Sequence, residues 1–286
     1  MIDYDCVVVG AGPAGMACAL YLKRANMNVL LIDKEAPGGN VLKAKIIENY
    51  LGVGRIKGSD LAFNMYKQLK ENEVSFELGM VKNILGKKGS FKVCVDEKIF
   101  KCKNVVIATG KGFGRFSLDD GKIAGISYCA ICDGSFYKNK TVGVYGVGEQ
   151  LYVDALYLAD LCDKVYLFVS DKANLNSKVL SVNNIEVVVG RITNLNSKLG
   201  QLSSVVLDDG SIYDLSGLFI SLKKGFSLPI TLKMKNGGID VDDNMLTSID
   251  GIYAVGDVRF KKYYQISTAV NDGIIAALNI KEEKYE

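Results

Sequence analysis

The chain has 286 residues, a formal net charge of +3 and hydrophobic side chains at 49% of its positions, a composition typical of one or two globular domains. Its charge is too small and too dispersed to indicate a nucleic-acid partner, and no apolar run approaches the roughly 20 residues of a membrane span. No signal-peptide pattern precedes the first predicted strand, so we expect a cytoplasmic protein. Histidine is absent, which excludes His-based acid–base catalysis and any zinc site that uses imidazole.

The chain opens with a pattern of strand, turn, helix and strand. Residues 4–9 form a continuous apolar run of the kind found in buried parallel strands. The sequence GAGPAG follows at 10–15, residues 14–25 continue with helical spacing, and 28–33 reads as a second strand. This segment is a predicted βαβ unit.

A similar unit recurs roughly 135 residues later in the chain. It comprises a strand at 141–145, a glycine turn at 146–148, a helix at 149–162 and a second strand at 164–169. The recurrence predicts two Rossmann-like domains rather than a solenoid.

Further short strands follow the second unit, and the chain closes on another strand–turn–helix pattern. Residues 185–189, 203–207 and 217–221 are predicted strands. The sequence GIYAVGDV at 251–258 precedes a predicted helix at 266–279. This last block completes the first domain, so the second domain is an insertion within it.

The predicted fold is therefore α/β, with two Rossmann-like domains and the second inserted in the first. Residues 1–113 and 244–286 form the first domain, and 114–243 form the second. Glycine-rich stretches near 110–114 and 237–238 are predicted to be hinges between them.

The first glycine turn has the spacing of a dinucleotide-binding turn. Gly10, Gly12 and Gly15 lie between the buried strand and the helix, and Asp33 ends the next strand. The first glycines allow a tight turn and a close approach of a pyrophosphate to the helix N-terminus. Asp33 is placed to bond a ribose hydroxyl. A turn without a ligand is the alternative for this segment alone.

Two distant segments favour a ligand at this turn. Residues 105–110 read VVIATG, and Gly256–Asp257 would put a carboxylate beside a second helix N-terminus. The combination of GxGPAG, ATG and GD resembles the two-dinucleotide-binding-domain flavoproteins, whose first domain binds FAD. The resemblance implies that Asp257 holds the ribityl chain of the flavin.

Cys129 and Cys132 form a CxxC motif within SYCAICDG at 127–134. A bare CxxC is compatible with half a zinc site, with a disulfide or with chance, but no second pair of zinc ligands exists and no metal site is expected. The small ring that two such cysteines close suits reversible dithiol exchange. The remaining cysteines are scattered and are expected to be buried small hydrophobic residues: Cys6, Cys18, Cys94, Cys102 and Cys162.

The octet is similar to the active site of the low-molecular-weight thioredoxin reductases, whose motif is close to S-x-C-A-x-C-D-G. The resemblance extends along most of the chain. EAPGGN at 35–40 and IENYLG at 47–52 match the segments around the isoalloxazine, while Tyr264–Gln265, 268–269 and Gly273 match the last helix of the family.

The resemblance implies a role for each residue of the redox centre. The second cysteine, Cys132, faces the flavin and forms the transient adduct, whereas Cys129 exchanges with the thioredoxin disulfide. Asp133 shuttles the proton, with a pKa raised by burial. A homodimer is implied as well. The residues expected to bind FAD are Gly10, Gly12, Pro13, Ala14, Gly15, Asp33, Lys34, Gly39, Asn40, Asn49, Ala108, Thr109, Gly110, Gly256, Asp257, Gln265 and Ile266.

The second glycine turn departs from the pattern of the NADPH-using relatives. Glu149 places a carboxylate where the pyrophosphate would sit, and Leu151 replaces a small residue. Val-Ser-Asp at 169–171 stands where those relatives carry a basic cluster, and no arginine lies between Arg115 and Arg191. We expect this domain to be a degenerate nicotinamide-type domain that carries the CxxC motif.

A reductase without a nicotinamide site needs another electron donor. The chain resembles the ferredoxin-dependent flavin thioredoxin reductases, which lack the nicotinamide motifs. Transfer from a ferredoxin near about −400 mV to a thioredoxin near about −270 mV releases roughly 6 kcal/mol for two electrons. Lysine pairs at 223–224 and 261–262 are candidates for steering an acidic ferredoxin.

Three other functions stay open at this stage. Asp171 ends the strand at which NADH-binding domains hold a ribose, so a divergent NAD(P)H-dependent reductase is one. A flavin dithiol oxidase that passes electrons to oxygen is the second. The third is a flavin-loaded redox sensor that shows no turnover with any donor.

Overall fold

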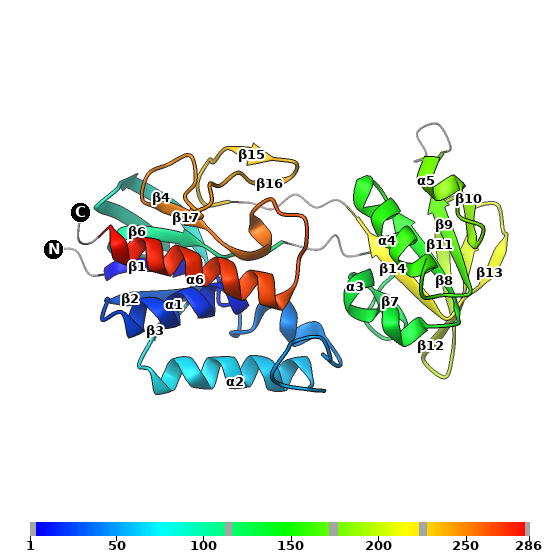
Figure 1. Cartoon of the computed structure of the whole chain (residues 1–286), viewed down its shortest axis with the longest axis horizontal. Coiled ribbons are helices and arrows are strands. Elements are labelled where there is room, and N and C mark those ends of the chain that lie inside the picture. Colours follow the sequence, from blue (N-terminus) through cyan, green and yellow to red (C-terminus); the bar gives the residue numbers. More distant parts are fainter. Residues whose placement is uncertain (1–3, 112–115, 172–176, 223–227, 284–286) are drawn as a thin grey trace. The chain divides into compact units, whose positions relative to one another are not determined.

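The computed structural model describes residues 4–111, 116–171, 177–222 and 228–283. The chain divides into two compact units (Figure 1). The first unit contains Met1–Lys111 and Phe226–Glu286, and the second contains Gly112–Gly225. Among the described residues, no helix combines the length and the apolarity that crossing a membrane would require.

The first unit is built around a sheet that is seven-stranded within the described residues, with the order β3-β2-β1-β6-β5-β4 and β17 paired to β6. The strands of this sheet are β1 (Tyr4–Val9), β2 (Val29–Asp33), β3 (Ser75–Leu78), β4 (Val81–Lys87), β5 (Ser90–Val95), β6 (Lys98–Ile107) and β17 (Ile252–Ala254). The unit also contains a two-stranded sheet of β15 (Met234–Lys235) and β16 (Gly238–Ile239). Its helices are α1 (Pro13–Arg24), α2 (Gly58–Glu71) and α6 (Ile266–Glu282), with 3-10 turns η1 (Gly39–Lys43) and η3 (Gly256–Val258).

Alternation along β1 divides the core of this unit into two layers. Cys6 and Val8 point to the face covered by α1 and α6, which lie side by side (Figure 1). Val7 and Val9 point to the opposite face, where they pack with β5 and β17. Successive strand residues face opposite sides of a sheet, so an apolar run buried on both faces is what a central parallel strand requires.

The second unit has a five-stranded parallel sheet in its described part, with the order β10-β9-β8-β14-β7, and a three-stranded antiparallel sheet, β11-β12-β13. Its strands are β7 (Ile126–Ser127), β8 (Thr141–Gly146), β9 (Lys164–Val169), β10 (Ile185–Val189), β11 (Ile192–Lys198), β12 (Gln201–Leu207), β13 (Ile212–Asp214) and β14 (Gly217–Ser221). Its helices are α3 (Ala130–Asp133), α4 (Glu149–Ala159) and α5 (Ser177–Leu180), with the 3-10 turn η2 (Gly134–Tyr137).

Each face of the parallel sheet in the second unit has its own apolar cover. Leu151 and Leu158 of α4 pack with Val144 on one face. Phe168 and Leu218 pack with residues of the antiparallel sheet on the other. Burial on both faces again explains the nearly continuous apolar sequence of these strands.

Helix α4 is shorter than predicted. It ends at Ala159 rather than at Cys162. The N–H of Leu161 donates to the Leu158 carbonyl at 3.0 Å, an i→i−3 bond that tightens the last turn where the helix ends. Apolar periodicity alone does not reveal this, because Leu161 and Cys162 still face the core.

The return from the second unit to the first lies earlier than the predicted boundary at 243/244, because residues 226–243 belong to the first unit. Leu232 and Ile239 are buried in its core, and the N–H of Phe260 donates to the Ile239 carbonyl at 2.9 Å. These contacts anchor a segment whose sequence has no clear periodicity.

The glycines at 237–238 do not form a hinge between the units. Asn236 and Gly237 have positive φ angles of 44° and 81° and join the antiparallel strands β15 and β16. Positive φ at two central residues is what a tight hairpin turn requires, which explains the Asn-Gly pair. The other predicted hinge, 110–114, falls mostly on residues outside the described part of the chain.

Candidate functional site

The turn between β1 and α1 requires glycine at two positions. A Cβ on Gly10 would collide with the carbonyl oxygen of Ala108, and a Cβ on Gly15 would collide with that of Gly10. Gly10 also has a φ angle of +111°. Gly12, in contrast, has no atom within 4 Å of its Cβ position. The turn is therefore tight against the sheet and open on the side of Gly12.

The N-terminus of α1 has no side-chain cap. Gly12 is the N-cap, Pro13 and Ala14 begin the helix, and the first turn contains no acidic residue. The first amides of a helix lack intrahelical acceptors and carry its positive dipole end. This end of a 12-residue helix is thus suited to a phosphate group at the open side of Gly12.

Asp33, at the end of β2, is fixed by the same turn. Its Oδ2 accepts the N–H of Ala11 at 2.6 Å, and its Oδ1 accepts the N–H of Glu35 at 3.0 Å. A carboxylate has about four acceptor positions, so a ribose hydroxyl can still bind. The Lys34 side chain is 59% exposed, and its ammonium lies 3.7 Å from the Glu35 carboxylate. Its predicted role in cofactor binding therefore has less structural support than that of Asp33.

The segment 38–40 reaches the glycine turn. The N–H of Gly38 donates to the Ala11 carbonyl at 2.8 Å, and Gly39 lies so close that its Cβ position is 3.3 Å from the Cα of Gly12. The Asn40 amide donates to the Lys111 carbonyl at 3.4 Å.

The segment after β6 lies on the other side of the same turn. The N–H of Ala108 donates to the Val9 carbonyl at 2.7 Å. Thr109, which follows, is exposed, and Gly110 has a φ angle of +71°.

Gly256 and Asp257 lie beside the start of α1. A Cβ on Gly256 would be 2.7 Å from that of Ala14, and the φ angle of Gly256 is +75°. Burial raises the pKa of Asp257, against the opposing effect of the Lys261 ammonium 3.3 Å from Oδ1. This Oδ1 is buried and accepts no hydrogen bond from the protein. A buried acceptor of this kind fits the ribityl hydroxyls of FAD.

A buried ionic network behind Asp257 was not predicted. Asp272 of α6, 1% exposed, accepts two hydrogen bonds from Arg259 at 2.7 and 2.8 Å, one from Lys261 at 3.1 Å and one from the Gly256 N–H at 3.1 Å. The network fixes the GD turn through its backbone. The sequence signal for this network is an acidic residue, Asp272, on the apolar face of the helix predicted at 266–279.

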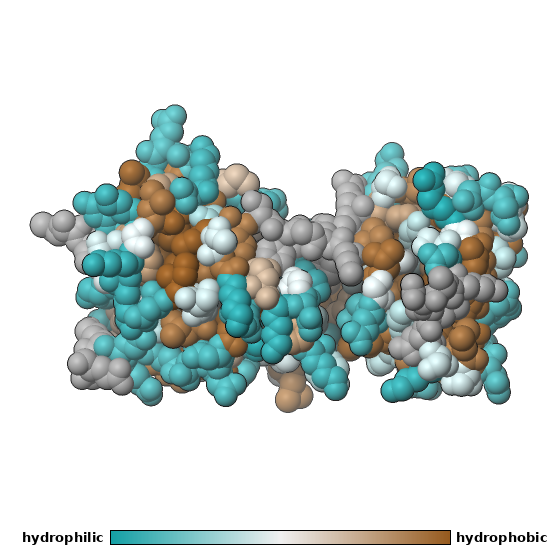
Figure 2. All heavy atoms as spheres, turned by 90° about the horizontal axis from the view of Figure 1, so that it is seen from above, coloured by the Kyte–Doolittle hydropathy of each residue, from teal (hydrophilic) through white to brown (hydrophobic). Residues whose placement is uncertain are grey.

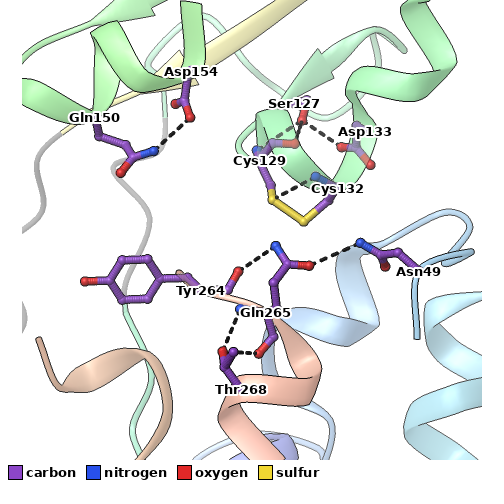
Figure 3. Close-up of a disulfide and its surroundings, with 10 residues drawn as sticks. All are labelled: Asn49, Ser127, Cys129, Cys132, Asp133, Gln150, Asp154, Tyr264, Gln265 and Thr268. Atoms are coloured by element: carbon purple, nitrogen blue, oxygen red, sulfur yellow. Dashed lines mark hydrogen bonds between the residues drawn. A yellow bond between two sulfur atoms is a disulfide. The ribbon is translucent and has the colours of Figure 1, made fainter. Parts of the chain in front are cut away.

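Gln265 and Asn49 are brought together (Figure 3). The Asn49 amide donates to Gln265 Oε1 at 3.1 Å, and the Gln265 amide donates to the Tyr264 carbonyl at 2.9 Å. Gln265 is the N-cap of α6, Ile266 is its first residue, and Thr268 Oγ1 accepts the Gln265 N–H at 3.1 Å. These bonds hold the loop at 47–52 against the start of α6.

In the second unit, Cys129 and Cys132 form a disulfide. The N–H of Cys132 donates to Cys129 Sγ at 3.2 Å (Figure 3). Cys129 is half-buried, and Cys132 is exposed. Hydrogen bonding to a sulfur favours its thiolate, so after reduction Cys129 is the better stabilised nucleophile.

Asp133 follows the disulfide on α3. Burial raises the pKa of its carboxyl, and a hydrogen bond from the Ser127 hydroxyl at 2.7 Å opposes that shift. A carboxyl with a raised pKa can hold and deliver a proton nearer to neutral pH. The structure therefore brings all three predicted residues of the redox centre together.

The turn between β8 and α4 differs from the first turn at its helix. Gly146 and Gly148 have positive φ angles of 152° and 88°, so the glycine backbone pattern remains. Glu149 is the first residue of α4, and Leu151 is 2% exposed with its side chain in the core. The end of β9 offers Val169, Ser170 and Asp171, of which the last two are exposed.

Among the described residues, no group of three His, Cys, Asp or Glu side chains is arranged to hold a metal ion.

The surface in the view of Figure 2 is mostly hydrophilic, with hydrophobic residues in smaller areas between. Exposed hydrophobic side chains in the first unit include Leu85 of β4 and Ile99 of β6.

Comparison with known proteins finds matches along nearly the whole chain. The family model described as pyridine nucleotide-disulphide oxidoreductase matches residues 4–273. A thioredoxin reductase of Ureaplasma parvum is 36% identical over 297 residues, which cover 98% of this chain and 96% of that protein. A structure of thioredoxin reductase from Streptococcus pyogenes matches with a TM-score of 0.91 and 30% identity, covering 99% of this chain and 98% of the other. A ferredoxin-flavin thioredoxin reductase from Clostridium acetobutylicum matches with a TM-score of 0.55 and 28% identity, covering 99% and 98%.

Proposed function

Because the chain belongs to the pyridine nucleotide-disulphide oxidoreductase family, and within it to the thioredoxin reductases, we propose that it passes electrons from reduced ferredoxin through FAD and the Cys129–Cys132 pair to thioredoxin. The protein is a flavin disulfide oxidoreductase with FAD as its cofactor. The donor and the roles of individual residues are the proposed part.

The residues of the first unit fit FAD. The uncapped N-terminus of α1 and the open side of Gly12 would take the pyrophosphate, and Asp33 a ribose. Asp257, whose buried Oδ1 has the Lys261 ammonium 3.3 Å away and accepts no hydrogen bond within the protein, would take the ribityl chain. Bound FAD supplies the conversion of single-electron transfers into the two-electron reduction of a disulfide.

The second glycine turn carries the proposal of a donor other than a nicotinamide. Glu149 puts a negative charge at the N-terminus of α4, where a pyrophosphate would need the positive dipole end. Leu151 fills the space between helix and sheet that a small residue leaves in a binding turn. The likeness to the Clostridium acetobutylicum ferredoxin-flavin enzyme supports the same donor.

The dithiol of the second unit carries out exchange with thioredoxin. The Cys129 thiolate, held by the Cys132 N–H, attacks one sulfur of the thioredoxin disulfide and forms a mixed disulfide. The leaving thiolate takes a proton from Asp133. Cys132 then attacks Cys129 Sγ and closes the disulfide, and the second thioredoxin sulfur leaves and is protonated. Two electrons and two protons pass to thioredoxin in all.

The donor is tested with the holoenzyme held anaerobically while its visible flavin absorbance is followed. NADPH, NADH and pre-reduced ferredoxin are added separately. We expect bleaching by ferredoxin alone and recovery when oxidised thioredoxin is added. A Cys129→Ser, Cys132→Ser double variant is the control and should bleach without recovering. Fast bleaching by either nicotinamide overturns the ferredoxin donor.

A nicotinamide donor is the second candidate, and one observation favours it. Asp171 follows β9, where a ribose ligand of NADH would stand. The relatives named thioredoxin reductase leave the donor open. The homodimer and the cytoplasmic location stay predictions.

A further inference from the structure

Ser127 lies between the backbone of Cys129 and the carboxylate of Asp133 (Figure 3). Its Oγ accepts the N–H of Cys129 at 3.1 Å. The same oxygen is 2.7 Å from Asp133 Oδ2 and 3.3 Å from the Cys129 carbonyl oxygen. The side chain is buried, with 4% of the residue exposed, so water does not compete for these contacts.

The hydroxyl has two acceptors within reach but only one hydrogen. When Asp133 is ionised, the hydroxyl donates to its carboxylate, which is the stronger, charge-assisted bond. When Asp133 is protonated, the carboxylic acid can donate to Ser127 Oγ, and the hydroxyl hydrogen turns to the Cys129 carbonyl. Both protonation states of Asp133 therefore keep a hydrogen bond at the same place.

We propose that Ser127 is a positioning residue that holds Asp133 as the proton donor of dithiol exchange through both of its protonation states. The inference rests on the proposed function, since it concerns the proton that Asp133 delivers. As the Cys129 thiolate attacks the substrate disulfide, an S–S bond forms, the substrate S–S bond breaks, and the leaving sulfur takes the proton from Asp133. The Ser127 hydroxyl then turns to the new carboxylate.

The fold places Ser127 independently of α3. It belongs to β7, where it pairs with Phe219 of β14, while Asp133 is the last residue of α3. The bond between them thus links the redox loop to the parallel sheet. Without it, Asp133 would keep only the support of its own short helix.

Among the described residues, the titratable groups near Asp133 include Tyr137, Tyr157 and the cysteine pair. Burial raises the pKa of Tyr137 of η2, and the nearby Asp133 carboxylate raises it further. Tyr157 of α4 packs against Gly134, the residue that follows Asp133. Tyrosines are neutral near pH 7, so Ser127 supplies the main hydrogen-bond response to ionisation of Asp133.

Two disulfide probes separate proton donation from structural support. The holoenzyme is reduced anaerobically with dithiothreitol, freed of excess reagent, and mixed with bis(2-hydroxyethyl) disulfide or with 5,5′-dithiobis(2-nitrobenzoic acid). The first releases a basic thiolate that needs a proton, and the second releases a weakly basic one that does not. No ferredoxin or nicotinamide is required, so failure of the proposed donor leaves this test intact.

We expect Ser127→Ala to slow reduction of the hydroxyethyl disulfide about tenfold, since a hydrogen bond to a charged group is lost. Reduction of the aromatic disulfide should stay within about twofold of wild type, because it bypasses the proton. Ser127→Thr keeps the hydroxyl and should restore the first rate. In an Asp133→Asn background, Ser127→Ala should add nothing, because Ser127 acts through Asp133.

Equal slowing of both probes by Ser127→Ala would mean that the serine only supports the loop. Additive effects of Ser127→Ala and Asp133→Asn would also overturn the inference. If Asp133→Asn alone leaves both rates unchanged, Asp133 is not the proton donor, and that part of the proposed function fails with the inference. Retained FAD absorbance and thermal midpoint show that each variant is folded.

Discussion

The two glycine turns of this protein share a backbone pattern but differ in what their helices present. After β1, glycines at 10, 12 and 15 leave an uncapped helix end with an open side. After β8, Gly146 and Gly148 keep their positive φ angles, yet the helix begins with Glu149 and buries Leu151. A glycine turn can therefore keep its backbone conformation while the charge and the packing of the helix beside it change.

The largest effect is expected at the redox-active cysteine pair of the second unit. Cys132→Ser should abolish disulfide reduction, a loss of at least about a thousandfold, because the mixed disulfide with Cys129 can no longer be resolved internally. FAD content should be unchanged, since the residues proposed to bind the cofactor lie in the first unit. Flavin absorbance and thioredoxin reduction are the measurements. Substantial turnover in this variant would remove the CxxC pair from the mechanism.

The first turn can be made to resemble the second. Pro13→Glu places a carboxylate at the first residue of α1, the position that Glu149 has in α4. We expect FAD affinity to fall about a hundredfold, because the charge repels the pyrophosphate from the helix N-terminus. Pro13→Gln is the matched neutral control and should lose less. Titration of apoprotein with FAD gives both constants, and equal losses would show that size rather than charge decides.

The stability of the apoprotein is expected to depend on pH through Asp257. Burial raises the folded pKa of this carboxyl above its ordinary value, so the folded state holds its proton to higher pH than the unfolded state. Stability from this group is present below the ordinary aspartate pKa and is lost as pH rises through the raised folded pKa. Asp133 acts in the same direction.

Asp257→Asn should therefore weaken the fall in stability of the apoprotein as pH rises above about 4. Urea unfolding at several pH values measures it. Asp133→Asn is the matched variant in the second unit, where the raised pKa has the same cause. A decline that is unchanged in both variants would show that neither carboxyl is responsible.

The smallest effect is expected from repairing the second turn alone. Glu149→Gln with Leu151→Ala removes the competing charge and opens the packing position, but no basic cluster is restored after β9. We expect the rate at which NADPH bleaches the flavin to stay within about threefold of the wild-type rate. Each charge-assisted bond to phosphate that is still missing is worth about 1.5–3 kcal/mol. Rapid bleaching would mean that these two residues alone close the site.

Local patterns in the sequence were sufficient for the two βαβ units, for the glycine turns and for the redox motif. The strands 164–169, 185–189 and 217–221 occur with the predicted bounds. The first and the last are largely buried and need the continuous apolar runs that are visible in the sequence, whereas 185–189 is an edge strand with only Val188 buried. Likewise, the CxxC spacing allows the disulfide that Cys129 and Cys132 form.

Contacts between distant segments decided the rest. The return of the chain at 226 depends on the burial of Leu232 and Ile239 in the core of the first unit, which no local period reveals. Asp272 gains its meaning only from Arg259 and Lys261, because a buried carboxylate is tolerated where opposite charges and hydrogen bonds surround it. Ser127 lies in a two-residue strand paired to the parallel sheet and Asp133 ends the one-turn helix that follows, so their contact depends on how the chain between them folds.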